Sequence, residues 1–171
     1  MRGVLNRLDN GALVFIRPIR AGDKLALQCS LRALSDESTR ARFLAPKDHF
    51  SRRELTYLTE VDGHEHVAFV AVEALHPTRI VGVSRFVRDP RERDTAEAAI
   101  TVADHLQGHG LGRLLGEKLA DAARAEGIRR FSASMLSDNV AALRLFTAIS
   151  ERLDTVPLDG PVREIFAELA A

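Results

Sequence analysis

The segment that decides the fold reads Gln107-Gly108-His109-Gly110-Leu111-Gly112, and it lies between a predicted strand ending near Val102 and a predicted amphipathic helix. Glycine lets the backbone turn tightly and approach a ligand with no side chain in the way. The first amides of a helix have no partners within it, and with the helix dipole they favour an anion such as a pyrophosphate. The segment therefore predicts an anion-binding loop, to which Arg113 adds a charge. A helix-entry loop whose glycines serve packing alone is the alternative.

Two common phosphate-binding loops do not fit this segment. It lacks the Gly-Lys-Ser/Thr sequence that ends a P-loop. Its glycines at 108, 110 and 112 are spaced as G-x-G-x-G, whereas the dinucleotide fingerprint is G-x-G-x-x-G. The glycine spacing therefore leaves two alternatives open, another kind of phosphate site and a helix-entry loop whose glycines serve packing alone.

The elements around the loop predict a mixed α/β fold. Residues 1–12 are predicted to be a tail, and residues 13–171 a single domain. Predicted strands cover residues 13–16, 67–72, 80–87, 95–102, 130–135 and 162–169, and predicted helices cover residues 23–34, 36–43, 51–59, 111–127 and 139–149. A helix over 164–169 is the alternative to the last strand. This order predicts a central, twisted, mostly antiparallel sheet with helices on both faces.

Composition excludes several classes of protein. The chain has 171 residues with 24 Lys and Arg against 24 Asp and Glu, so its formal charge is zero, which argues against a dedicated nucleic-acid binder. No segment reaches the roughly 20 apolar residues that span a bilayer, so no membrane contact is predicted. The single cysteine, Cys29, cannot form an internal disulfide and suits a reducing compartment, so a cytoplasmic location is predicted. Its helical apolar neighbours place Cys29 in the core rather than in a catalytic role.

Two motifs carry a resemblance to a known family. Gln107-x-x-Gly110-x-Gly112 has the Gln/Arg-x-x-Gly-x-Gly/Ala form of the pyrophosphate loop in GCN5-related N-acetyltransferases, the GNAT superfamily. Asn139-x-x-Ala142-x-x-x-Phe146 resembles the second cofactor motif of that superfamily, Asn-x-x-Ala-x-x-x-Tyr. The resemblance covers about residues 14–149. Residues 34–43 and the pair Ala96-Glu97 also look like those of bacterial protein-lysine acetyltransferases.

The resemblance implies acetyl-CoA as the acetyl donor and no metal. It implies that the backbone of Val102 pairs with the pantetheine arm and that the Ile100 amide lies near the thioester carbonyl. The residues implied to hold the pyrophosphate are Gln107, Gly108, His109, Gly110, Leu111, Gly112 and Arg113. The resemblance also implies that three residues flank the other side of the pantetheine arm: Asn139, Ala142 and Phe146.

The implied chemistry needs a base. A lysine amine is protonated at neutral pH, with a pKa near 10.4, so a general base must take a proton from it. Glu97 is the predicted base, and its small apolar neighbours Ala96, Ala98 and Ala99 are expected to desolvate its carboxylate and raise its pKa. By strand periodicity its side chain faces away from the side of Ala98, Ile100 and Val102. The alternative for Glu97 is a solvated carboxylate, or an ion pair with Arg85 or Arg88.

Two further catalytic points follow from the resemblance. The Ile100 amide is expected to donate a hydrogen bond to the oxygen that gains charge during attack. The superfamily often has a tyrosine general acid where this chain has Phe146, which cannot donate a proton. The thiolate is then expected to leave unassisted or with help from another group.

Other candidate residues carry weaker predictions. His64 and His66 would share a face of an extended segment and could bind a metal, but no third ligand lies nearby in sequence, so a polar strand end is favoured. His109 is expected to face solvent or a phosphate. Two roles are open to four arginines: a solvated helical surface, or a site for an acidic acceptor or the adenosine phosphate of the cofactor. The solvated surface is favoured. The four are Arg40, Arg42, Arg52 and Arg53.

The sequence thus predicts an N-acetyltransferase that moves an acetyl group from acetyl-CoA directly to an amine in a ternary complex. A protein lysine is the leading acceptor. A small amine or amino acid is one alternative, and an acyl-CoA-binding regulatory module with feeble turnover is another. A homodimer through the C-terminal strands is also compatible with the sequence.

Overall fold

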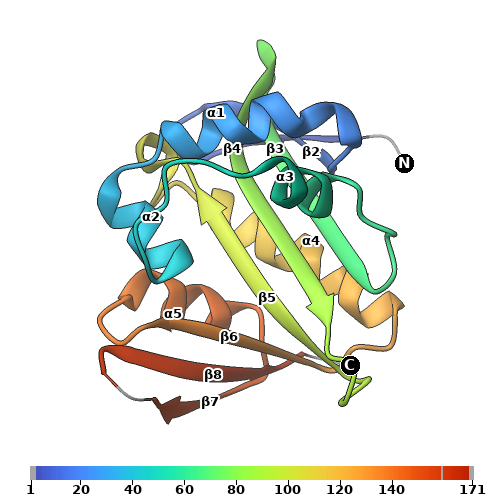
Figure 1. Cartoon of the computed structure of the whole chain (residues 1–171), viewed down its shortest axis with the longest axis vertical. Helices are drawn as coiled ribbons and strands as arrows, with labels where there is room; N and C mark the ends of the chain where they lie inside the picture. The colour runs from blue at the N-terminus through green and yellow to red at the C-terminus, as the bar shows by residue number, and fades with distance from the viewer. Residues whose placement is uncertain (1–2, 159, 170–171) are drawn as a thin grey trace.

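One mixed sheet organises the molecule (Figure 1). The computed structural model describes residues 3–158 and 160–169. The strands of this part are β1 (Val4–Arg7), β2 (Leu13–Pro18), β3 (His66–Glu73), β4 (His76–Arg88), β5 (Thr95–Val102), β6 (Arg130–Leu136), β7 (Arg152–Pro157) and β8 (Val162–Glu168). They lie in the order β1-β2-β3-β4-β5-β6-β8-β7, and β5–β6 is the parallel pair among otherwise antiparallel neighbours. The predicted mixed, mostly antiparallel sheet is confirmed.

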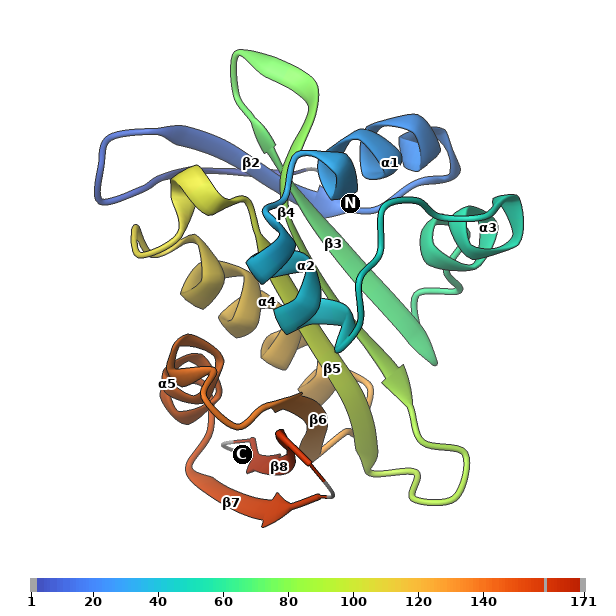
Figure 2. The ribbon, with the colours of Figure 1, turned by 60° about the vertical axis from the view of Figure 1, so that its left-hand side comes forward.

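Helices cover both faces of this sheet, as predicted (Figure 2). The α-helices are α1 (Lys24–Arg32), α2 (Asp36–Phe43), α3 (Arg52–Thr59), α4 (Leu111–Ala125) and α5 (Val140–Ala148). The first three lie on one face, and α4 lies on the other with α5 packed beside it. No helix of the described part is both long and apolar enough to cross a membrane.

Two hydrophobic clusters result, one on each face, and β3 contributes to both. Val67, Phe69 and Ala71 pack toward the cluster that includes α4. The alternate residues Ala68, Val70 and Val72 pack toward α1 and α3. Because side chains of a strand alternate between faces, a strand covered on both sides is apolar throughout. This explains the unbroken apolar run from residue 67 to 72.

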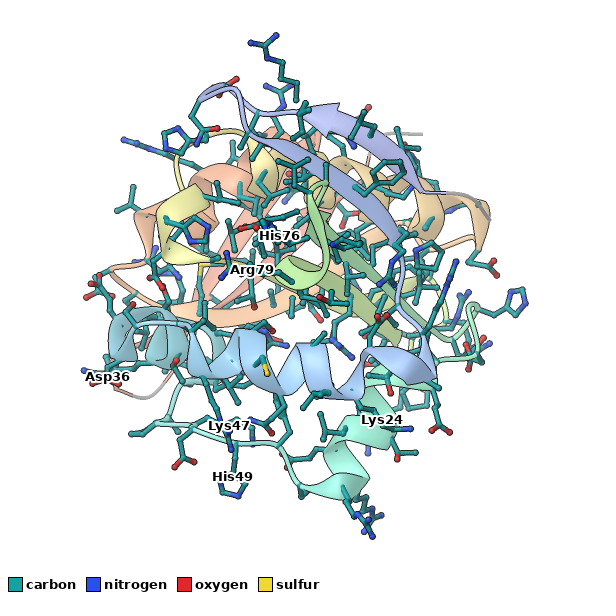
Figure 3. The ribbon with its side chains drawn as sticks, turned by 90° about the horizontal axis from the view of Figure 1, so that it is seen from above. Lys24, Asp36, Lys47, His49, His76 and Arg79 are labelled. Carbon is teal, nitrogen blue, oxygen red and sulfur yellow. The ribbon has the colours of Figure 1, made fainter. Side chains whose placement is uncertain are left out.

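Local signals in the sequence fix the helices on the first face. The Ser51 amide donates to Glu54 Oε2 at 2.7 Å, and the Glu54 amide donates to Ser51 Oγ at 3.2 Å, which is the predicted capping box of α3. Figure 3 shows α1, which starts at Lys24, running along one side of the sheet toward Asp36 at the start of α2, with Lys47 and His49 on the segment that leads on to α3. The predicted helix over 36–43 matches α2 at both ends.

The ends of the chain differ from the prediction. Residues 4–7 form β1, which pairs with β2 from Val4↔Ile16 to Arg7↔Leu13, so the prediction of a tail over 1–12 is wrong there. Residues 1 and 2 lie outside the described part. Residues 152–157 form β7, an edge strand that was not predicted, and residues 162–168 are a strand rather than the alternative helix. A homodimer through these C-terminal strands stays a prediction.

The parallel pair β5–β6 is short, and this opens the sheet. Its register runs only from Thr95↔Arg130 to Glu97↔Ser132, although β5 continues to Val102 and β6 to Leu136. In Figure 1 the two strands start side by side and then diverge. The edge of β5 beyond Glu97 is therefore free on the side of β6.

A glycine lets α4 approach β5 and α5 closely at this opening. A Cβ atom on Gly116 would lie 3.2 Å from Ile149 Cγ2, 3.3 Å from Leu145 Cδ1 and 3.4 Å from Ile100 Cδ1. These distances are tighter than ordinary carbon contacts, so a side chain here would push the helix away. The start of α4 is thereby held beside the free edge of β5.

Candidate active site at the β5–β6 opening

The loop before α4 presents unpartnered amides. Gly108 and Gly110 have φ angles of +74° and +88°, in the left-handed region that glycine adopts without steric cost. Gly110 is the N-cap of α4 and makes no side-chain capping bond. Within the described residues, none of the amides of residues 108–113 donates to a protein acceptor. These are the amides predicted to hold a pyrophosphate, and they have the free donors that an anion needs.

Gly110 also lies against the turn between β1 and β2. A Cβ atom at residue 110 would lie 3.3 Å from Asp9 Oδ2, and the Asp9 amide donates to the His109 carbonyl at 3.2 Å. The bond turns the His109 carbonyl toward the β1–β2 turn. A side chain at position 110 would therefore meet the carboxylate of Asp9 as well as backbone strain.

The backbone of β5 turns alternate residues toward the opening. The Ala103 amide donates to the Val81 carbonyl on the β4 side at 2.9 Å. Because backbone groups alternate along a strand, Thr101 also faces β4, while Ile100 and Val102 face the side where β6 has diverged. The Val102 carbonyl on that side accepts from Gln107 Nε2 at 3.1 Å. The predicted cofactor-facing residues Ile100 and Val102 thus present backbone groups at the opening.

A polar network joins this loop to α2, and the sequence did not predict it. Asp104 accepts from the Ser35 amide at 2.9 Å, from Ser35 Oγ at 2.7 Å and from Ser38 Oγ at 2.6 Å. Gln107 Nε2 donates to Ser38 Oγ at 2.9 Å as well as to Val102. These bonds hold the pKa of Asp104 below its usual value against the opposing effect of burial. The signals that could have found this network were an acidic residue just after a strand, Asp104, and a serine at the N-cap of a helix, Ser35.

The remaining predicted cofactor residues lie around the opening. Arg113 Nε donates to Glu117 Oε1 at 2.7 Å, so its guanidinium is engaged along α4 in this structure. Asn139 Oδ1 caps α5 by accepting from the Ala142 amide at 3.0 Å, which explains the spacing of this pair. Phe146 is buried in the main core, and Ala142 packs at its border. The second motif therefore has a structural role that the sequence alone does not separate from cofactor binding.

Glu97 lies where β5 and β6 part, but its side chain is exposed. The desolvation expected from Ala96, Ala98 and Ala99 is therefore wrong: Ala96 and Ala98 are buried on the opposite face of the strand, and half-buried Ala99 leaves the Glu97 side chain exposed. In the described part, Glu97 has no ion pair with Arg85 or Arg88, the two alternative partners. Its charge instead acts on Arg42 of α2.

A cleft lies beneath α1, α2 and α3 on the same face as Glu97. The space in it that can hold the centre of a water-sized sphere is about 50 Å³. Leucines and phenylalanines of the helices and of the segments between them form most of its wall, and Arg42, Arg85 and Thr101 supply polar groups. The prediction that Arg42 lies on a solvated helical surface is wrong, whereas Arg40, Arg52 and Arg53 are exposed as predicted. An arginine at position 85, in line with Val83 and Val87 of an apolar strand, was the signal for this cleft.

The two arginines of the cleft lack acidic partners. Arg85 is only 7% exposed; its Nη1 donates to His66 Nε2 at 3.1 Å, and its Nη2 to the Leu58 carbonyl at 3.3 Å. Burial and the charge of Arg42 lower the pKa of Arg85 to about 10. Burial also lowers the pKa of Arg42, and the charge of Glu97 opposes this effect. The two guanidiniums thus form a region of unbalanced positive charge.

His66 is held neutral beside Arg85, and this predicts a pH dependence of stability. Burial first, and then the charge of Arg85, lower the pKa of His66 from 6.5 to about 4. Between these values the unfolded chain binds a proton that the folded chain does not, so the free energy of unfolding falls as the pH falls from about 6.5 to 4. The expected loss is about 3 kcal/mol, at ~1.4 kcal/mol per pH unit. Urea unfolding across this range measures it.

His66→Gln is the matching variant, because its amide oxygen can still accept from Arg85. It should remove most of the slope between pH 6.5 and 4 while keeping most of the stability at pH 7. An unchanged slope would contradict the assignment to His66.

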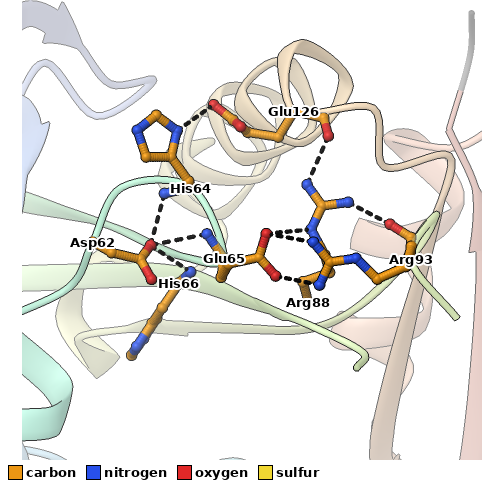
Figure 4. Close-up of polar contacts among 7 residues, drawn as sticks. All are labelled: Asp62, His64, Glu65, His66, Arg88, Arg93 and Glu126. Carbon is orange, nitrogen blue, oxygen red and sulfur yellow. Dashed lines mark hydrogen bonds and ion pairs between the residues drawn. The ribbon is translucent and has the colours of Figure 1, made fainter. Parts of the chain in front are cut away.

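The two histidines point apart, contrary to the shared face that was predicted (Figure 4). His64 Nδ1 lies 3.1 Å from Glu126 Oε1, whereas His66 extends to the opposite side toward Arg85. Asp62 between them accepts from the amides of residues 64, 65 and 66, which lowers the pKa of its carboxyl. The described residues contain no group of three or more side chains suited to a metal. Cys29 is exposed, so its predicted place in the core is wrong.

Comparisons with known proteins agree with this geometry. A model of the acetyltransferase (GNAT) family matches residues 31–149. The acetyltransferase Pat of Mycolicibacterium smegmatis is 35% identical over 140 residues, which cover 81% of this chain and 41% of that protein. The chain thus spans about two fifths of the length of this relative.

Solved structures share the fold. The GNAT domain of S. lividans PAT superposes with a TM-score of 0.85 at 27% identity, covering 98% of this chain and 97% of that one. The Salmonella typhimurium protein yncA, solved with its cofactor acetyl-CoA, superposes with a TM-score of 0.71 at 21% identity, covering 91% and 92%. The family match over most of the chain, on this fold and with this loop, shows that the chain belongs to the acetyltransferase (GNAT) family.

Proposed function

We propose that this chain transfers an acetyl group from acetyl-CoA directly to a lysine side chain of a protein, with both substrates bound together. The observation that carries the proposal is the parting of β5 from β6 beside the uncapped start of α4. It combines a free strand edge, which suits the amides of a pantetheine arm, with free helix amides, which suit a pyrophosphate. Acetyl-CoA supplies an activated acyl group on a thiol leaving group.

The residues proposed to hold acetyl-CoA lie around the opening between β5 and β6. The amides of residues 108–113 bind the pyrophosphate, and Gln107 fixes the loop through Val102 and Ser38. The backbone of Val102 pairs with the pantetheine arm. Asn139, Ala142 and Phe146 of the α5 region flank that arm on the far side.

Glu97 is the proposed base. It lies at the last paired position before the opening, on the face of β5 that also carries Thr101 and the cleft. Its exposed carboxylate can reach an amine brought by another protein and accept its proton, directly or through water. The Ile100 amide, which faces the opening, donates to the oxygen that gains charge during attack. Phe146 offers no proton, so the thiolate leaves without an acid from that position.

An exposed base favours a protein acceptor, because a lysine on a flexible segment can approach from solvent. The likeness to the acetyltransferase Pat of Mycolicibacterium smegmatis supports this class of protein. The cytoplasm is the proposed location of the acceptor, as the single unpaired cysteine suggested.

The test measures binding and transfer separately. Acetyl-CoA should raise the melting temperature, because a ligand that binds the native state stabilises it. Mass spectrometry should then find more acetyl-lysine on proteins of a bacterial lysate when chain and acetyl-CoA are both present than with either one alone. Transfer to free amines alone would favour the small-amine alternative, and binding without transfer would favour a regulatory module. No shift in melting temperature would contradict every version of the proposal.

A further inference from the structure

We propose that the cleft containing Arg42 and Arg85 binds a small monocarboxylic acid with an apolar body. The inference concerns binding alone and does not rest on acetyl transfer. It starts from Arg42, whose side chain is half-buried in the cleft and has no hydrogen-bond or ion-pair partner among the described residues. The Phe43 ring lies beside it, with its centroid 4.9 Å from Arg42 Cζ.

The guanidinium of Arg85 lies in the same cleft as that of Arg42 and adds to its positive charge. Arg85 lies on β4 at the floor of the cleft and donates only to neutral groups, His66 Nε2 and the Leu58 carbonyl. The neutral state of His66 follows from its lowered pKa, so it supplies no charge of its own at pH 7. Cations removed from water are costly unless an anion or several acceptors compensate them. This region of the structure therefore has an unmet demand for negative charge.

The missing partner of Arg42 favours a carboxylate on the ligand. Two guanidiniums face the cleft, and no acidic side chain of the described residues bonds to either of them. A single carboxylate beside Arg42 would supply that partner. A planar guanidinium pairs bidentately with carboxylate and with phosphate, and of the two a carboxylate combines more readily with a small apolar body.

The rest of the cleft selects an apolar body. Leu27, Leu31, Phe43, Phe50 and Val83 contribute to its wall, and about 50 Å³ of the cleft can hold the centre of a water-sized sphere. Small-ligand sites are mostly apolar with a few fixed polar groups. A short branched aliphatic group suits such a wall and so small a space.

The depth of the arginines favours a free acid over an acidic side chain of a docked protein. Arg85 is 7% exposed and lies beneath three helices, and an aspartate or glutamate carboxylate extends only two or three bonds from its backbone. A folded partner would have to insert its main chain into the cleft to reach Arg85. A free acid needs no such insertion.

The experiment is calorimetric titration of the full chain, without acetyl-CoA, using 4-methylpentanoate as the probe. We expect measurable binding that weakens at least about tenfold for 4-methylpentanamide, which keeps the shape but not the charge, and for acetate, which keeps the charge but not the apolar body. Arg42→Gln should weaken the carboxylate at least about tenfold and leave the amide unchanged. Arg40→Gln is the matched control, because Arg40 is exposed on the same helix, and it should bind like the wild type.

Several outcomes would overturn the inference. They are no binding of 4-methylpentanoate, equal binding of acid and amide, or equal binding by the wild type and Arg42→Gln. Tighter binding of an acidic peptide than of the free acid would also overturn it. Arg42 is the residue to change, because Arg85 also has structural bonds to His66 and Leu58. Since acetyl-CoA is absent from the titration, its result is independent of the transfer assay.

Discussion

Glu97→Gln should lower kcat for acetyl transfer by about 100-fold to 10,000-fold, the range that a general base contributes. Glutamine keeps the size of the side chain and its exposed position but cannot accept the proton of the amine. The affinity for acetyl-CoA should stay the same, because the side chain lies on the face of β5 away from α4. Steady-state kinetics across pH, with acetyl-CoA binding by calorimetry, measure both effects.

The pH profile separates a base from a residue that merely shapes the site. In the wild type, kcat/KM should rise with pH as the base loses its proton. This rise should be absent from the pH profile of Glu97→Gln. Glu151→Gln is the control, because Glu151 is also exposed but lies just after α5 rather than on β5. A Glu97→Gln enzyme with near-normal turnover at all pH values would remove Glu97 from the mechanism.

Gly110→Val should raise the dissociation constant for acetyl-CoA by roughly 100-fold, through two effects. A β-branched residue at a φ of +88° costs on the order of 1–3 kcal/mol, so the loop should leave its present conformation. The new Cβ would also lie 3.3 Å from Asp9 Oδ2. Both effects displace amides that are proposed to bind the pyrophosphate. Calorimetric titration with acetyl-CoA measures the loss.

Gly63→Val is the matched control for backbone strain. Gly63 has a φ of +82°, a Cβ atom there would have no other atom within 4 Å, and the residue lies in the turn before β3. The substitution should lower the melting temperature by a similar amount while leaving acetyl-CoA affinity unchanged. Equal losses of affinity in both variants would mean that Gly110 acts through overall stability alone.

The central strands and the loop could be predicted from the sequence because their signals are local. The predicted strand 95–102 matches β5 at both ends, and the helix stop at Gly127 agrees with its φ of +76° directly after α4. Each of these depends on residues within a few positions of one another. Local patterns of this kind persist when the chain folds.

The missed elements depend on pairing between distant segments. β1 is recognisable only once it lies beside β2, since Val4 and Leu5 remain half exposed and Asn6 interrupts the apolar pattern. β7 reads Arg152 to Pro157 and forms an edge whose residues are largely exposed. An edge strand needs less hydrophobicity than a central one, so its sequence signal is weak.

The environment of the site residues was harder to predict than their identity. Period two correctly separated the face of Glu97 from that of Ala98, but the alanines flanking Glu97 in sequence are buried on the far side and do not desolvate it. The charged helix around Arg42 predicted a surface residue, yet the cleft, which Leu31, Val83 and Arg85 also line, half-buries its side chain. Burial of a long charged side chain is decided by neighbours that are remote in sequence.

The hydrogen bonds from Ser35 and Ser38 to Asp104, and from Gln107 to Ser38, have a thermodynamic consequence. They tie α2, which carries Arg42, to the loop that precedes α4, so one helix borders both proposed ligand sites. If acetyl-CoA changes the affinity of the cleft by some factor, an acid in the cleft must change the affinity for acetyl-CoA by the same factor. We therefore expect Asp104→Asn to bring this factor closer to one without removing either site, which calorimetric titration of each ligand with and without the other measures.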